Sequence, residues 1–248
     1  MQLTGWYPVY LRELLLFRRK CLRPGYLISA GLVPLMYLTV FGLGLGGSVR
    51  LAGGDYLSFL LPGLIAMTSM TNAYACVASA LCLTRLYTKT FQLLVQAPVS
   101  AAGIVLGEAL AAMTKGLFAA GLLIGMGLLL PGQFRVTPLL LLATMLNSGM
   151  FACLGVVAGL LVRSHEETST YTNVFILPMA FFGGTFFPLD RLPAGLRAVV
   201  WALPLSQTNV LIRREHLDGP AAAALLALAA YTTLFFVIGM RRIQRYSE

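Results

Sequence analysis

Residues 138–162 read PLLLLATMLNSGMFACLGVVAGLLV, without one charged side chain. A helix of about 20 apolar residues crosses the hydrocarbon core of a bilayer, which is about 30 Å thick. The run is continuously apolar rather than alternating, so it predicts a helix and not a strand of a membrane barrel. Five further stretches read in the same way: Leu27–Gly47, Tyr56–Leu83, Ile104–Leu130, Thr172–Phe187 and Ala221–Met240. The sequence therefore predicts an all-α membrane protein with six transmembrane helices, the fourth being Pro138–Val162.

The composition supports this class. Of the 248 residues, 58% are hydrophobic and 11% charged, and the mean hydropathy is +0.81. That much apolar surface cannot be hidden inside a soluble globule of this size. The polar stretches between the six runs are short, so residues 1–248 are expected to form a single membrane domain.

The charge pattern predicts the orientation. The net charge of +9 does not indicate nucleic-acid binding, because the basic residues cluster at the ends of the runs, where membrane lipid headgroups are the expected partners. With six crossings both termini share a side, which carries eleven Lys and Arg residues against six on the other. This excess predicts cytoplasmic termini. The cysteines lack metal-like spacing and are interpreted as buried small hydrophobes: Cys21, Cys76, Cys82 and Cys153.

Two amphipathic segments lie outside the runs. Residues 4–20 mix aromatic and basic side chains, which predicts a helix in the cytoplasmic interface that could receive a soluble partner. Residues 84–98 are expected to contain a short helix that ends before Pro98. Its apolar face would lie either on lipid or in the groove of a partner protein. The side chains of this face are Leu86, Phe91, Leu94 and Val95.

Polar and ionisable residues inside the runs are candidates for function, because a bilayer makes them costly. Glu108 and Lys115 share a helix face but lie about 10 Å apart along the axis, too far for direct contact unless the side chains bend. Glu108 could instead snorkel to the interface. The second run holds a polar cluster that either packs against another helix or lines a substrate path: Thr68, Ser69, Thr71, Asn72 and Tyr74.

The fifth run is short and carries Pro178, Gly183 and Gly184. After it, Leu196–Leu205 is largely apolar again, which predicts a short re-entrant element over residues 188–205, before the last span. Non-helical backbone at membrane depth is tolerated only where protein covers it or where it lines a cavity. This segment is therefore expected to shape the outer end of a pathway.

Four motifs, in this order, resemble the permease subunits of ABC-2 type exporters over essentially the whole chain. They are YLSFLLPGL at 56–64, LLVQAPVS at 93–100, FGGTFFPL at 182–189 with Leu192-Pro193, and LPL at 203–205. Within the family, IVLGE at 104–108 followed by Thr114-Lys115 resembles the nodulation-factor (lipooligosaccharide) exporter permeases, so the chain looks NodJ-like. PGLI at 62–65 and TNAYA at 71–75 look equally like related bacterial multidrug and lipid exporter permeases.

The resemblance implies a homodimer in the bacterial cytoplasmic (inner) membrane, bound to two cytoplasmic ABC ATPase subunits. ATP and Mg²⁺ would belong to that partner, because this sequence has no Gly-rich loop followed by Lys-Ser/Thr; no cofactor, metal or catalytic residue is assigned to the chain itself. The family usually has Glu where this chain has Gln92, so charge-assisted pairing is lost there. The ATPase-coupling residues implied are Arg12, Arg85, Tyr87, Lys89, Phe91, Gln92 and Leu94.

These expectations combine into one mechanism. Closure of the ATPase would move residues 84–98 with the second and third spans and open a path between two copies of the chain, with an outer gate at Phe182–Leu205. The walls are aromatic and aliphatic, so the expected cargo is amphipathic, lipid-linked or glycolipid-like. The candidate path and gate residues are Thr71, Asn72, Glu108, Lys115, Phe182, Phe186, Phe187 and Pro188.

Three other functions stay open. A membrane enzyme needs convergent catalytic groups, but the two histidines, His165 and His216, are expected on opposite sides of the membrane. Glu166 and Glu167 are adjacent and point different ways. An ion-coupled carrier that works without ATP would be favoured by inverted repeats, which the sequence does not show, and its two intramembrane charges make a thin proton relay. Sequence does not exclude a structural or assembly subunit.

Overall fold

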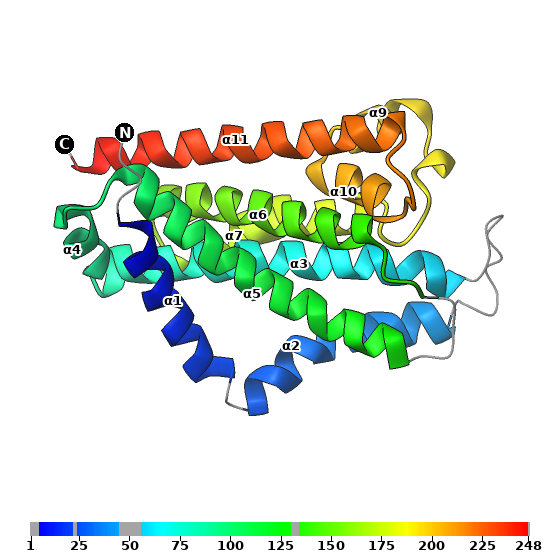
Figure 1. Cartoon of the computed structure of the whole chain (residues 1–248), viewed down its shortest axis with the longest axis horizontal. Coiled ribbons are helices and arrows are strands. Elements are labelled where there is room, and N and C mark those ends of the chain that lie inside the picture. Colours follow the sequence, from blue (N-terminus) through cyan, green and yellow to red (C-terminus); the bar gives the residue numbers. More distant parts are fainter. Residues whose placement is uncertain (1–4, 22–23, 45–55, 130–133, 248) are drawn as a thin grey trace.

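The computed structural model describes residues 5–21, 24–44, 56–129 and 134–247, and every regular element in these ranges is helical. Four long helices run side by side along the molecule (Figure 1): α3 (Tyr56–Cys82), α5 (Ala101–Leu129), α6 (Pro138–Leu161) and α11 (Gly219–Ser247). A π-helical turn, η2 (Leu83–Tyr87), extends α3. All four are long and apolar enough to cross a membrane. The prediction of an all-helical membrane protein is confirmed at this level.

The remaining two predicted spans correspond to segmented helices. For the first, α2 (Pro24–Tyr37) continues into the π-helix η1 (Leu38–Gly44), and residues 45–47 lie outside the described part of the chain. Pro34 removes one backbone donor within α2. The fifth predicted span corresponds to three consecutive elements: α7 (His165–Tyr171), η3 (Thr172–Ile176) and α8 (Leu177–Phe182).

The predicted bounds of the fifth span, Thr172–Phe187, are wrong at both ends. The helix begins at His165, because the hydroxyl of Ser164 accepts a hydrogen bond from the Glu167 N–H (3.1 Å) and caps it. It ends at Phe182, and Gly184 then adopts a φ of +83°, a left-handed conformation that glycine enters without a steric penalty.

The segment predicted to be re-entrant is a pair of helices. A 3₁₀ turn, η4 (Leu189–Arg191), leads into α9 (Ala194–Trp201), and α10 (Pro204–Ile212) follows. Pro204 at the first position opens α10, which extends well beyond the predicted end at Leu205. Residues 206–209 of α10 are polar and interrupt the apolar pattern, yet all are buried in the bundle.

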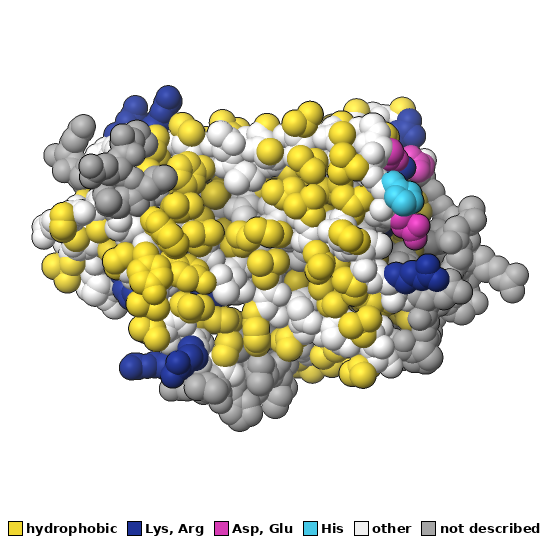
Figure 2. All heavy atoms as spheres, in the orientation of Figure 1, with side chains coloured by type: hydrophobic (Ala, Val, Ile, Leu, Met, Phe, Trp, Pro, Cys, Tyr) yellow, Lys and Arg dark blue, Asp and Glu magenta, His cyan; other side chains and the backbone are white. Residues whose placement is uncertain are grey.

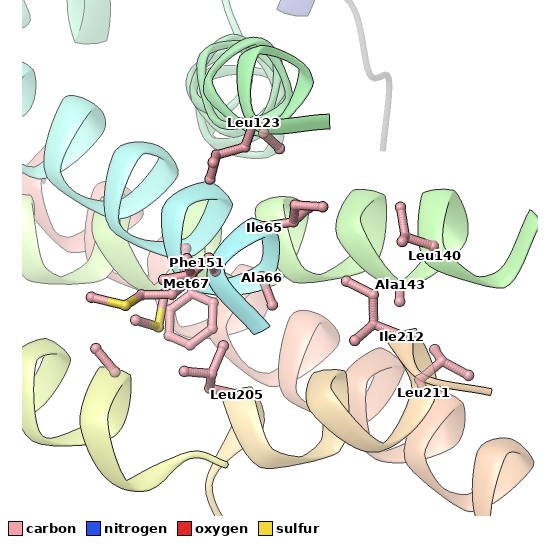
Figure 3. Packing of buried hydrophobic residues seen from close by; sticks show 14 of the residues in the cluster. Ile65, Ala66, Met67, Leu123, Leu140, Ala143, Phe151, Leu205, Leu211 and Ile212 are labelled. Atoms are coloured by element: carbon pink, nitrogen blue, oxygen red, sulfur yellow. The ribbon is translucent and has the colours of Figure 1, made fainter. Parts of the chain in front are cut away.

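α3 is the central helix and packs against both α5 and α6. Gly155 and Gly159 lie one turn apart on α6 and allow its backbone to approach α3. A Cβ at Gly155 would lie 2.7 Å from the carbonyl oxygen of Tyr74, and one at Gly159 would lie 3.0 Å from that of Ala78. Small residues at this spacing are typical of helix interfaces in membranes. Figure 3 shows the apolar core where α3, α5, α6 and α10 meet: Ile65, Met67, Leu123, Leu140, Phe151 and Leu205.

The outer surface matches a bilayer environment. In Figure 2 apolar side chains cover the middle of the face, and charged side chains gather near its two ends. Most of α11 faces outward, including Leu226 and Leu234. The start of α1 (Trp6–Cys21), α4 (Thr90–Gln96) and the end of α11 lie at one end of the molecule, whereas α9 and α10 lie at the other (Figure 1).

Candidate functional site

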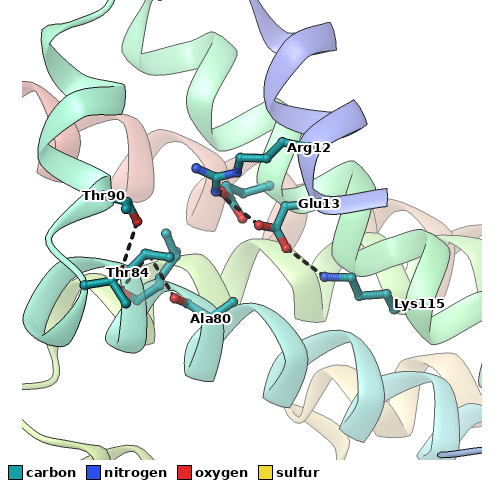
Figure 4. A network of polar contacts seen from close by, with 9 residues as sticks. Arg12, Glu13, Ala80, Thr84, Thr90 and Lys115 are labelled. Atoms are coloured by element: carbon teal, nitrogen blue, oxygen red, sulfur yellow. Dashed lines mark hydrogen bonds and ion pairs between the residues drawn. The ribbon is translucent and has the colours of Figure 1, made fainter. Parts of the chain in front are cut away.

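Four charged side chains join α1 to α5. Lys115 Nζ lies 2.9 Å from Glu13 Oε2, and Arg12 Nη2 lies 3.0 Å from Glu108 Oε1 and 3.1 Å from Glu13 Oε1 (Figure 4). Glu108 and Lys115 come from α5, where they were predicted to share a face without touching. In the structure each is paired with a residue of α1 instead, and Arg12 bridges the two carboxylates. We call Arg12, Glu13, Glu108 and Lys115 the charge network.

Three of the four side chains of the charge network are buried, and the fourth, Arg12, is 35% exposed. The side chains of Glu13, Glu108 and Lys115 are 5%, 2% and 10% exposed. Burial raises the pKa of the Glu13 carboxyl, but Lys115 and Arg12 together lower it by more, so the pKa lies below its ordinary value of 4.5. The carboxylate of Glu13 therefore stays ionised and holds Lys115. Removing one partner of such a buried pair is strongly destabilising, because it leaves the other charge without compensation.

Close packing supports the same contact between α1 and α5. A Cβ at Gly107 would lie 2.7 Å from both the Trp6 carbonyl oxygen and Val9 Cβ, so only glycine allows this approach. Farther along, the rings of Phe17 and Phe118 meet edge to face at 5.5 Å. The predicted amphipathic helix of residues 4–20 is thus a helix over Trp6–Cys21 that is fixed to α5.

The loop predicted to couple to an ATPase has an inner and an outer side. Phe91 of α4 is 1% exposed and packs among Leu81, Ile104 and Val105, so the apolar face of α4 covers its own bundle. Leu94 is half-buried beside it. The side chains of this loop that remain exposed are Tyr87, Thr88, Lys89, Thr90, Gln92, Leu93, Gln96 and Pro98.

Arg85 is a half-buried cap rather than an outward charge. Its guanidinium donates to the carbonyl oxygens of Leu160 and Val162 at the end of α6. The last carbonyls of a helix have no partner within the helix, and a cation favours that end of the helix dipole. Arg85 therefore fixes η2 to the end of α6.

The polar cluster of α3 divides into two groups. Thr71 and Asn72 bond to backbone carbonyls of their own helix, Thr71 Oγ1 to Met67 (3.0 Å) and Asn72 Nδ2 to Thr68 (3.0 Å). Both side chains are half-buried. Ser69, in contrast, faces α6 and contacts Asn147. The sequence did not identify Asn147 as a site residue.

Asn147 of α6 is a buried hub for three helices. Its Nδ2 donates to the carbonyl of Ala66 (2.9 Å) and to Ser69 Oγ (2.6 Å), and its Oδ1 accepts from Thr208 Oγ1 of α10 (2.9 Å). Each contact crosses a helix interface, where polar groups in a membrane gain most from a partner. The one signal for this site in the sequence was the amide side chain of Asn147 in an apolar run that has no charged residue.

The predicted gate residues do not form one group. Phe186 is buried, and its ring lies 4.8 Å from Phe41, 5.3 Å from Phe181 and 5.6 Å from Tyr37. Phe182 is exposed, whereas Phe187 and Pro188 are half-buried. Glu13, Asn209 and Arg213 also proved to have structural partners that the sequence did not indicate.

Comparison with known proteins shows the family to which the chain is related. Residues 10–214 match the family described as ABC-2 type transporter. Nodulation protein J of Rhizobium leguminosarum bv. viciae is 31% identical, with 97% of this chain and 94% of that protein aligned. Nodulation protein J of Rhizobium meliloti (strain 1021) is 30% identical over 97% of this chain and 93% of that protein. The inner membrane transport permease YadH of Escherichia coli (strain K12) is 27% identical over 85% of this chain and 84% of that protein. The chain belongs to the ABC-2 type transporter family, as a membrane permease subunit.

Proposed function

We propose that this permease is the membrane half of an ATP-driven exporter in the bacterial inner membrane. Two copies would assemble with two cytoplasmic ABC ATPase subunits, which bind ATP and Mg²⁺. The near full-length similarity to two nodulation J proteins supports a shared transport role. The name of the YadH relative supports the inner membrane as the location.

The proposed topology has six crossings with both termini in the cytoplasm. Four crossings are α3, α5, α6 and α11. The other two are the segmented helices 24–44 and 165–182; the first is largely apolar, whereas the second is polar over residues 165–171 and apolar over residues 174–182. The end of α11 and α4 lie at the same end of the molecule, as cytoplasmic termini and a cytoplasmic coupling loop require.

The charge network is the observation that carries the mechanism. α1 and α4 are the elements expected to receive the ATPase. Because Glu13 and Arg12 fix α1 to α5, a push on α1 must move α5 with it. The exposed side of α4 would give the ATPase its second contact, through Tyr87, Lys89, Gln92 and Leu93.

The proposed path lies between two copies of the chain, with its outer gate near Phe186. Aromatic rings from α2, η1 and α8 surround that residue. Such walls suit an amphipathic, lipid-linked or glycolipid-like cargo leaving the cytoplasm or inner leaflet. The pairing of Glu108 and Lys115 with α1 favours a structural role for these charges over a proton relay, which argues against an ion-coupled carrier.

A matched pair of substitutions tests the coupling surface. Leu93 on α4 is 67% exposed and Leu196 on α9, at the other end, is 44% exposed. Leu93→Asp should weaken binding of the partner ATPase to the purified permease at least tenfold and lower stimulated ATP hydrolysis in proportion. Leu196→Asp should change neither. Equal ATPase binding by both variants and the unchanged protein would remove α4 from the coupling surface.

A further inference from the structure

The segment Gly183–Phe186, just after α8, is buried and non-helical, yet side chains satisfy all four of its carbonyl groups. The donors come from α3 and from the end of α10: Tyr56, Asn209 and Arg213. Asn209 Nδ2 donates to Gly183 O (2.8 Å), Arg213 Nη2 to Gly184 O (2.7 Å) and weakly to Thr185 O (3.5 Å), and Tyr56 Oη to Phe186 O (3.0 Å). We call these three side chains the carbonyl cradle.

The carbonyl cradle supplies the hydrogen bonds that a non-helical segment needs inside a bilayer. Irregular backbone at membrane depth must find partners within the protein, because lipid offers none. Gly63 of α3 lets the segment approach: a Cβ there would lie 2.8 Å from the Thr185 carbonyl oxygen and 2.9 Å from Arg213 Nη2. The motifs at 56–64 and 182–189 therefore meet at this place, and Leu205 of the motif at 203–205 lies against the same segment, because a Cβ at Gly183 would lie 2.9 Å from Leu205 Cδ2.

Arg213 is the central member. Its guanidinium stacks on the Phe59 ring, 3.8 Å from the centroid, and reaches the Phe59 carbonyl as well (3.4 Å). A planar, delocalised cation can stack and donate in several directions at once, which a lysine cannot do in the same space. The next residue, Arg214, is exposed and pairs with Asp218 on the surface. Two neighbouring arginines thus have opposite environments.

The cradle decides where the Phe186 ring lies. Phe186 follows directly on the held carbonyls, and its own carbonyl is bound by Tyr56. With the backbone fixed, the ring is placed among Tyr37, Phe41 and Phe181, which belong to α2, η1 and α8. Release of the backbone would allow the ring to leave this aromatic cluster.

We infer that Arg213, Asn209 and Tyr56 are positioning residues that hold the outer gate closed by fixing the backbone of Gly183–Phe186. This inference rests on the proposed export function, which makes that end of the molecule the exit. The cradle and the gate nevertheless exist without ATP, so the inference can be tested on the permease alone.

The test uses Thr185→Cys as a reporter, because Thr185 is fully buried and similar in size to cysteine, in a protein whose four native cysteines are replaced. The protein is placed in lipid nanodiscs, and its reaction with a membrane-impermeant maleimide is timed. Arg213→Gln should speed labelling at least tenfold, and Tyr56→Phe, which removes one hydroxyl and keeps the ring, about threefold. Arg213→Lys should not restore slow labelling. Arg214→Gln should leave the rate unchanged.

A second reporter separates local release from general loosening. Cys153 of α6 is 4% exposed and far along the chain from the cradle; kept as the single cysteine, it should stay unreactive in every variant. The inference is overturned if Tyr56→Phe and Arg213→Gln leave the labelling rate of the Thr185→Cys reporter unchanged, or if Cys153 becomes reactive in parallel. If the variants open the gate but ATP with the ATPase partner does not, the cradle stands and the proposed ATP-driven function fails.

Discussion

The ammonium group of Lys115 lies 2.9 Å from the carboxylate of Glu13, although 102 residues separate them in the chain. Lys115 comes from a long apolar helix and Glu13 from the helix that precedes the first span. This contact pairs the costly intramembrane charge of Lys115 with a buried carboxylate of α1 and so joins the two helices, because removing one partner leaves the other charge without compensation.

Breaking that joint should destabilise the protein. We expect Lys115→Met to cost about 3 kcal/mol, because the buried carboxylate of Glu13 loses its buried cation and keeps only Arg12, which is 35% exposed. Glu13→Leu combined with Lys115→Met should recover most of the loss, since no buried charge is then left from this pair. Thermal unfolding in detergent for the two singles and the double measures the coupling. Arg18→Gln, exposed on α1, is the control, and purely additive single effects would contradict the joint.

The stability contributed by Glu13 should depend on pH in one direction. Its folded-state pKa lies below 4.5, so the contribution is present above that pH and is lost as the pH falls through the folded value. The difference in Tm between the unchanged protein and Glu13→Gln should therefore shrink as the pH falls below about 4.5. A difference that does not shrink in this acid range would mean that the carboxylate of Glu13 is not held ionised by Lys115 and Arg12.

Two glycine-to-alanine substitutions test whether α6 packs closely against α3, one at the contact and one at an open position. Gly155→Ala should destabilise the bundle by about 1–3 kcal/mol, because its Cβ would meet Val77 Cγ1 at 2.5 Å and the Tyr74 backbone. Gly125→Ala on α5, with no atom within 4 Å, should be neutral or stabilising by about 0.5–1 kcal/mol. Unfolding of the two variants under the same conditions decides the matter, and equal effects would rule out the close approach of α6 to α3.

Two asparagines test the hub in the same way. Asn147→Ala removes three contacts across helices and should cost about 2 kcal/mol. Asn72→Ala removes a bond within its own helix and should cost under about 0.5 kcal/mol. Thermal unfolding of both variants is the measurement. A larger loss at Asn72 would show that the predicted path residue, not the hub, holds the interior.

Two basic residues of the predicted coupling loop should behave differently. Arg85→Gln should lower Tm and reduce the free energy of unfolding by about 1–3 kcal/mol, because the carbonyls of Leu160 and Val162 lose their partner. The side chain of Lys89 is exposed. Its backbone is in the left-handed conformation, with φ of 55°, which asparagine tolerates. Lys89→Asn should keep Tm and weaken ATPase binding. A variant at Lys89 that binds the ATPase normally would limit the coupling surface to the rest of α4.

Most of the long helices could be predicted because continuous apolar runs end at charges or glycines. α6 was predicted within one residue at its end. The fifth span failed because residues 165–171 are polar but continue the helix behind the Ser164 cap. The length of α10 was missed because its polar side chains find partners inside the bundle, which a hydropathy pattern cannot show.

The site followed the same logic. Glu108 and Lys115 were identified because charges in a membrane are costly, but their partners lie 96 and 102 residues away and depend on how α1 docks. Arg213 is one of the six basic residues that the sequence places on the outer side, whereas in the structure it is part-buried against carbonyls and Phe59. Partners across the fold require the tertiary structure.

The most direct test of the central claim is what accompanies the permease out of its native membrane. The chain, tagged and extracted in mild detergent, should co-purify with an ABC ATPase subunit in equal amount, and the eluate should hydrolyse ATP in a Mg²⁺-dependent, vanadate-sensitive reaction. Lys115→Met should keep the ATPase bound but lower its transport-coupled hydrolysis. A permease that elutes alone and supports no ATP hydrolysis would contradict the account.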